Sequence, residues 1–107
     1  MRGEVLKGHL DLLLLSALVP GPAHGYSIIA RIKTRSAGAF ELAEGTVYPA
    51  LHRLEQAGLL ESEWSDDAAR RRRIYRLTRK GRKAVAERKS EWSEFVDAMS
   101  LALGKAT

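Results

Sequence analysis

The chain has 107 residues, of which 45% are hydrophobic and 29% charged, as expected for one globular domain. The absence of cysteine excludes disulfides, cysteine-bound zinc and a thiol nucleophile, and it fits a reducing cytoplasm. The formal net charge is +5 at pH 7, and nine of the 18 lysines and arginines lie between Arg70 and Lys83. Such a concentrated basic segment indicates a polyanionic partner.

The N-terminal segment has the order of a short signal peptide, because Arg2 and Lys7 precede a run of leucines. Two acidic residues, Glu4 and Asp11, interrupt that pattern, and no small-residue cleavage site follows. The apolar run is also far too short to cross a bilayer. We therefore expect a buried helix at this point and no membrane partner.

Two helices are expected in the first third of the chain. The first should cover residues 8–19 and end at Pro20–Pro22, because two prolines and a glycine cannot continue it. Its leucines lie on nearly all sides, which predicts either the central helix of the core or a helix between two subunits. The second should cover residues 25–36, with His24 at its start, isoleucines on one side and Gly38 after its end.

A third helix is expected before Gly58, where apolar residues recur at helical spacing. Pro49 lacks an amide hydrogen and is tolerated only in a first turn, so this helix should begin at Gly45 or Thr46. Thr46 is the better cap, because its hydroxyl can accept a free backbone N–H. Gly58 suits the left-handed position of a Schellman ending.

After the third helix the hydrophobic period becomes alternating, which predicts a β-hairpin. One side of each strand is formed by Leu60, Ser62 and Trp64, and by Arg73, Tyr75 and Leu77. A polar turn joins the strands, and Arg70–Arg73 open the return strand. Three helices followed by a hairpin are the order of a winged helix-turn-helix. The predicted fold class is therefore mainly α with a small β-hairpin.

A last helix is expected over residues 79–103, with Thr78 as its N-cap. A helix of about 24 residues extends about 36 Å, beyond the span of so small a domain. Its apolar stripe has nothing later in the chain to cover it, so we expect a homodimer; the alternative is that the helix folds back on its own domain. The expected interface comprises Leu10, Leu14, Leu18, Val85, Trp92, Phe95, Val96, Met99 and Leu103.

The exposed face of the third helix carries groups that suit double-stranded DNA. In a helix-turn-helix the later helix lies in the major groove. Thr46 and Tyr48 can bond phosphate or sugar, Pro49 fixes the helix start, and His52 and Arg53 can reach base edges. Two alternatives stay open, because Tyr48 could pack against the neighbouring helix and His52 could be a solvated surface residue.

The arginines of the expected wing form the second candidate contact with DNA. Arg70, Arg71, Arg72 and Arg73 can follow phosphates or enter the minor groove. Four adjacent like charges repel one another without an anion, which favours phosphate binding. The alternative is a solvated charge cluster held by acidic residues 66 and 67.

Three stretches resemble the PadR family of bacterial transcriptional regulators. They are HGYSIIARI at residues 24–32, EGTVYPALHRLEQAGLLESEW at residues 44–64 and RRRIYRLTRKGR at residues 71–82. The resemblance implies a dimeric winged-helix repressor of the short subfamily, with DNA-binding residues 1–78 and a dimerisation helix in residues 79–107. Some members sense small aromatic compounds, which implies that Trp92 could line an effector cleft between subunits.

The sequence shows no paired-carboxylate motif, nucleophile elbow, phosphate loop or metal constellation, so we expect no enzyme activity, metal or cofactor. The expected function is sequence-specific DNA-binding regulation, with a homodimer that represses from a palindromic operator and is released by a small molecule. Two other hypotheses stay open: a winged-helix module for protein–protein contact, and a ligand-binding dimer with a secondary DNA role.

Overall fold

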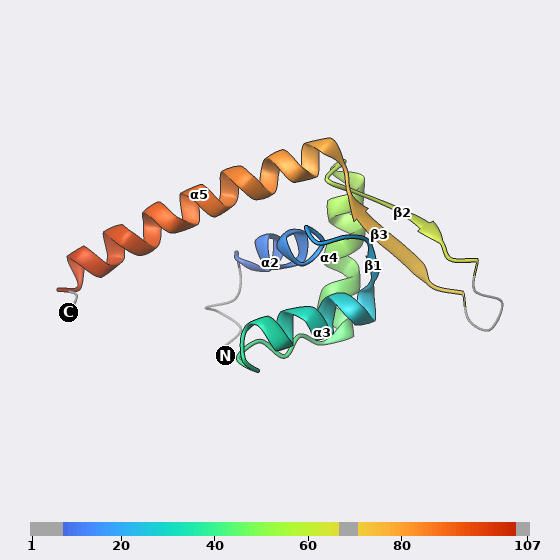
Figure 1. The fold of residues 1–107 in the computed structure, drawn as a ribbon, viewed down its shortest axis with the longest axis horizontal. Coiled ribbons are helices and arrows are strands. Elements are labelled where there is room, and N and C mark those ends of the chain that lie inside the picture. Colours follow the sequence, from blue (N-terminus) through green and yellow to red (C-terminus); the bar gives the residue numbers. More distant parts are fainter. Residues whose placement is uncertain (1–7, 67–70, 105–107) are drawn as a thin grey trace.

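The computed structural model describes residues 8–66 and 71–104. In these residues the elements are α2 (Leu10–Ala17), β1 (Ala23–His24), α3 (Gly25–Arg35), α4 (Glu44–Gln56), β2 (Leu60–Trp64), β3 (Arg73–Leu77) and α5 (Arg79–Ala102). Figure 1 shows α2, α3 and α4 gathered together, with the β2–β3 hairpin projecting on one side and α5 extending to the other. The expected mainly α fold with a small hairpin is confirmed.

The three strands form one antiparallel sheet in the order β1–β3–β2. The hairpin was expected, whereas β1 was not. In the register of the sheet, Tyr75 of β3 lies opposite Ala23 of β1 on one side and Ser62 of β2 on the other. Two residues are too few to show an alternating pattern, so β1 gives no signal of its own.

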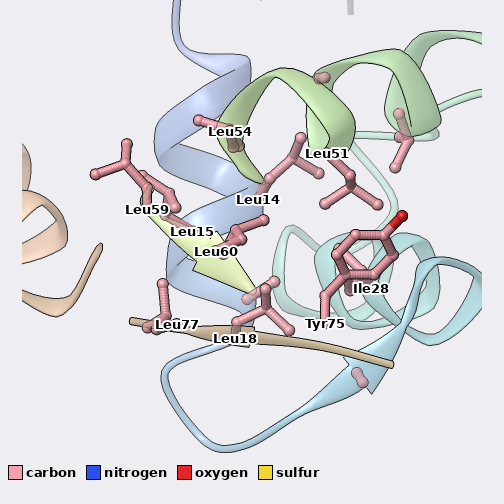
Figure 2. Close-up of a cluster of buried hydrophobic side chains, with 14 of the residues drawn as sticks. Leu14, Leu15, Leu18, Ile28, Leu51, Leu54, Leu59, Leu60, Tyr75 and Leu77 are labelled. Carbon is pink, nitrogen blue, oxygen red and sulfur yellow. The ribbon is translucent and has the colours of Figure 1, made fainter. Parts of the chain in front are cut away.

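The hydrophobic core lies where the helices meet the inner side of the hairpin (Figure 2). The α2 helix packs against α3, α4 and α5, which confirms the central helix expected from its leucines. Tyr75 is the largest fully buried side chain, with 1% of its surface exposed. The other large side chains that are fully buried are Leu14, Leu15, Leu18, Ile28, Val47, Leu51, Leu54 and Leu60.

Three residues that were expected at a dimer interface belong to this core. Leu14 is 0%, Leu18 1% and Val85 4% exposed, so their side chains are not available to a second chain. The reason is that α3, α4 and α5 of the same chain already cover the apolar sides of α2. Leu10 is partly buried against the same core.

The α4 helix begins earlier than expected. It starts at Glu44, and its N-cap is Ala43, whose side chain makes no capping hydrogen bond. The expected cap, Thr46, lies inside the first turn, where its backbone N–H donates to the carbonyl of Ala43 at 3.0 Å. Pro49 therefore lies inside the helix rather than in its first turn. Because proline has no N–H, the carbonyl of Gly45 lacks its usual helical donor.

The ends of α4 and α5 follow the sequence signals. Gly58 has a φ of +81°, and the N–H of Leu59 donates to the carbonyl of Leu54 at 3.0 Å, as in a Schellman ending. Thr78 caps α5 by accepting from the N–H of Gly81 at 3.0 Å. The Thr78 hydroxyl also donates to the carbonyl of Gly58 at 2.6 Å.

The start of α5 is fitted closely against the end of α4. The N–H of Thr78 donates to the carbonyl of Leu59 at 3.1 Å, and Nζ of Lys80 donates to the carbonyl of Ala57 at 2.9 Å. A Cβ atom at Gly81 would lie only 2.0 Å from the carbonyl oxygen of Leu59. Only a glycine lets the two backbones approach this closely.

The outer half of α5 extends away from the helices of the core (Figure 1). It gives the molecule a longest dimension of 55 Å against 28 and 22 Å in the other directions. The exposed large hydrophobic residues in or just after α5 are Trp92, Phe95, Val96, Met99, Leu101 and Leu103. Within residues 8–66 and 71–104, no helix is long and apolar enough to span a bilayer.

Candidate nucleic-acid interface

A cleft of about 930 Å³ lies between the start of α3, one side of α4 and the β2–β3 hairpin. It brings Tyr48 and His52 of α4 together with Arg71–Arg73 of the hairpin. The other lining residues are His24, Gly25, Tyr26, Glu44, Glu55, Trp64 and Tyr75. The fold thus joins two segments that were separately expected to contact DNA into one concave surface.

The two expected base readers, His52 and Arg53, lie on different sides of α4. Successive helical residues are about 100° apart, so they cannot face the same way. His52 is exposed and lines the cleft. Arg53 faces α2, where its Nη1 and Nη2 donate to the carboxylate of Asp11 at 2.9 and 3.1 Å. Pro49 and Thr46 are also exposed on α4 and do not line the cleft.

Tyr48 has a packing role at the start of α3. Its side chain is half-buried against the core, and a Cβ atom at Gly25 would lie 2.6 Å from the tyrosine ring. The ring therefore occupies the space above Gly25, which is the packing alternative that the sequence left open. Tyr48 also lines the cleft.

The arginines of the hairpin gather around Trp64. The guanidinium carbon of Arg71 lies 4.9 Å from the centre of the Trp64 ring, and that of Arg73 lies 5.3 Å from it. Both distances are within the range of cation–π attraction. Nε of Arg73 also donates to the hydroxyl of Ser62 at 2.8 Å. Arg70 was expected to act with them, but it lies outside the described residues.

Arg72 approaches His24, the N-cap of α3. Its Nη1 atom lies 2.9 Å from Nε2 of His24, while Nδ1 of His24 accepts from the backbone N–H of Ser27 at 3.3 Å. Burial lowers the pKa of His24, and the positive charges of Arg72 and Arg31 lower it further. His24 thus has the helix-start role that the sequence predicted. A neutral imidazole has one acceptor nitrogen, and in His24 this is the Nδ1 atom that caps the helix.

Carboxylates do not neutralise the outer part of this arginine group. Within the described residues, Arg71 and Arg72 form no ion pair, and the nearest oxygen of Glu55 is 3.9 Å from Arg73. Asp66 forms none either within that part of the chain, and residue 67 lies outside it. The described residues therefore give no support to a charge cluster held by these acidic residues.

A family model described as the transcriptional regulator PadR-like family matches residues 14–87. The chain belongs to this family. Its members are DNA-binding regulators and not enzymes, and their winged-helix fold agrees with the fold described above. In this PadR-like regulator α3 and α4 form the helix-turn-helix pair, and the β2–β3 hairpin is the wing.

Known proteins resemble this PadR-like chain over most of its length. It is 44% identical over 84 residues to "Transcriptional regulator Rv3488" of Mycobacterium tuberculosis, covering 78% of this chain and 76% of that protein. A PadR family transcription regulator from Clostridium difficile R20291 is 34% identical, with a TM-score of 0.78 and coverage of 90% and 99%. A transcriptional regulator from Clostridium thermocellum has a TM-score of 0.84 at 29% identity, with coverage of 94% and 95%.

A second, smaller cleft of about 420 Å³ lies between α2 and α5 of the PadR-like fold. Trp92, the residue expected to line an effector site, forms one wall together with Phe95, and their ring centres are 5.9 Å apart. The ring of His9 meets Trp92 edge-on, with 4.9 Å between centres. Asp11 also lines this cleft while it binds Arg53.

Sequence reasoning missed three contacts of the candidate interface. Trp64 was noted only as an alternating strand residue, Asp11 only as an interruption of a signal-like segment, and His24 without its arginine neighbour. The position of Trp64 opposite Arg73 on paired strands could have indicated their contact, since residues on one side of a hairpin are neighbours. The Asp11–Arg53 pair spans 42 residues, and no local pattern indicates it.

Proposed function

We propose that this PadR-like regulator binds double-stranded DNA through α4 and the wing together. The observation that supports this best is the shared cleft, in which exposed His52 lies with the wing arginines, and Arg71 and Arg72 form no ion pair within the described residues. A concave cationic surface attracts the phosphate backbone, and the open side of α4 is free to enter a major groove.

The exposed residues of α4 and the wing arginines would have different roles. We expect the exposed residues His52, Pro49 and Thr46 of α4 to lie in the major groove, where base edges are read. Arg71–Arg73 would bind phosphates or the minor groove beside it. Arg53 would contact DNA only after leaving Asp11, because the bidentate pair holds its guanidinium against α2. Tyr48 would position α4 and offer its hydroxyl to a phosphate.

The proposed active form is a homodimer joined through α5. The outer part of this helix exposes Trp92, Phe95, Val96 and Met99, with exposed fractions between 38% and 53%. A large apolar patch of this kind marks a protein interface. Residues 1–78 would then be the DNA-binding part and residues 79–107 the dimerisation part. A two-fold dimer would place two α4 helices on a palindromic operator.

The finer regulatory proposal is repression in the cytoplasm, with release by a small molecule. A dimer that occupies an operator blocks other proteins from the same DNA. The cleft beside Trp92 and Phe95 is the place where we expect an aromatic effector to bind. Such a ligand would stack on the indole ring in the manner of aromatic pairs.

The test of DNA binding is a salt titration of the purified chain. We expect fluorescence anisotropy to show binding to a labelled duplex from the DNA upstream of the chain's own gene. Log K should fall linearly with log salt, by about 0.9 for each phosphate contact. The triple variant Arg71→Ala, Arg72→Ala, Arg73→Ala should flatten that slope and weaken operator and random duplexes alike. Absence of binding to any duplex at low salt would contradict the proposal and favour a protein–protein module.

A further inference from the structure

We propose that Trp64 is a positioning residue of the wing, which holds Arg71 and Arg73 ready to bind DNA phosphates without neutralising their charge. This inference rests on the proposed DNA-binding function and adds a residue that acts through its neighbours. Trp64 is the last residue of β2, directly opposite Arg73 in the strand pairing.

The exposure of Trp64 indicates that its ring does not serve the core. Half of the side chain, 50%, is exposed, and Trp64 is not among the residues of the hydrophobic cluster. The face of an exposed tryptophan ring is available to neighbouring cations. Here the ring lies next to two guanidinium groups, at 4.9 Å from Arg71 and 5.3 Å from Arg73.

A ring holds an arginine differently from a carboxylate. Arg76 of β3 is an arginine held by carboxylates. It pairs with Glu61 and Glu63, and these carboxylates neutralise its charge. The ring of Trp64 attracts a cation through its quadrupole and leaves the full charge in place. A guanidinium stacked on a ring also keeps its N–H donors at the edge of the plane, where phosphate oxygens can reach them.

The arginine side chains would otherwise be free. Long side chains lose rotamer freedom when they bind, and that loss weakens an interface. The backbone around Arg71 lies outside the strand, so the Trp64 ring is the contact that limits its side chain in the described part of the chain. Arg73 has three such contacts, with the ring, with the hydroxyl of Ser62 and with the carboxylate of Glu55 at 3.9 Å. Removing the ring should therefore release Arg71 more than Arg73.

The proposal predicts a weaker affinity with an unchanged number of phosphate contacts. Trp64→Leu keeps an apolar side chain and removes the aromatic face. We expect it to weaken duplex binding by about tenfold, because Arg71, and to a lesser degree Arg73, must then be ordered on binding. Its salt slope should equal that of the wild type, because all the charges remain. Arg71→Ala should instead lower the slope by about 0.9. Trp64→Tyr should restore most of the affinity.

A measurement on the free protein tests the stacking itself. Side-chain δ protons of an arginine above an indole ring are shifted upfield by the ring current. In the NMR spectrum of the wild type without DNA we expect such shifts for Arg71 and Arg73, and their loss in Trp64→Leu. Thermal unfolding of each variant confirms that the fold is retained.

The outcomes separate this inference from the proposed function. If the wild type binds no duplex, DNA binding fails and the positioning role fails with it. If the wild type binds and Trp64→Leu binds within twofold of it, only the positioning role is overturned. A salt slope in Trp64→Leu as low as that of Arg71→Ala would also overturn it, because the ring would then be needed for the contact itself.

Discussion

Tyr48 of α4 packs on Gly25, the first residue of α3, so closely that a Cβ atom there would lie 2.6 Å from the ring. The contact joins the two helices of the helix-turn-helix at the point where both border the cleft. Residue 25 therefore favours glycine because a Cβ atom has no space beside the tyrosine ring. Backbone conformation is not the reason, since φ of Gly25 is not in the left-handed region.

Gly25→Ala should destabilise the fold, by about 1–3 kcal/mol, since the tyrosine ring must move from a packed site. The matched control is Gly45→Ala at the start of α4, where a Cβ would meet no atom within 4 Å. That change should be neutral or stabilising by about 0.5–1 kcal/mol. Urea unfolding of both variants provides the comparison, and equal midpoints would refute the packing argument.

Asp11→Asn should free Arg53 from α2. The pair is exposed, so we expect the free energy of unfolding to fall by no more than about 1 kcal/mol. If the released guanidinium reaches a phosphate, the salt slope of DNA binding should rise by about 0.9. Arg53→Ala in the Asp11→Asn background should return the slope to that of the wild type. An unchanged slope in Asp11→Asn would show that Arg53 stays clear of DNA.

Phe95→Glu combined with Met99→Glu should yield monomers that lose operator binding. The two carboxylates would be buried without partners in the proposed α5 interface, which is strongly unfavourable. Sedimentation equilibrium measures the mass directly. Ala86→Glu with Ser90→Glu is the control, because it adds the same charge at exposed positions on another side of α5. A wild type that is monomeric at micromolar concentration would refute the dimer.

Acidification should destabilise the fold through His24. Its pKa is lowered in the folded chain by burial and by Arg72 and Arg31, so the unfolded chain binds more protons as the pH falls. The stabilising contribution is complete above the ordinary pKa of about 6.5 and is lost as the pH falls through the folded value. His24→Asn retains a capping side chain and removes the titration. The difference in melting temperature between wild type and His24→Asn should therefore shrink below pH 6.5; a constant difference would contradict the assignment.

The helices and hairpin could be predicted because each has a local signal. Thr78 before α5 and Gly58 after α4 mark helix ends by their own chemistry. The predicted start of α4 was wrong because its N-cap, Ala43, makes no side-chain hydrogen bond, so no capping residue type marks this position in the sequence. The two-residue β1 strand exists only because β3 lies beside it.

The sequence predicted which residues form the candidate site better than it predicted which way their side chains point. The sequence indicates that α4 and the wing carry polar and basic groups on exposed sides. The sequence does not indicate that Arg53 pairs with Asp11, because that contact depends on how α2 packs against α4. The same holds for Leu14 and Leu18, whose exposure depends on how many neighbours cover α2.

The close joint between α4 and α5 has a consequence for operator geometry. Hydrogen bonds from Thr78 and Lys80, and the fit of Gly81 on Leu59, fix the angle at which α5 leaves the domain. In a dimer built through α5, that angle sets how far apart the two α4 helices stand. The spacing between operator half-sites would then be determined by residues 57–59 and 78–81, none of which we expect to touch a base.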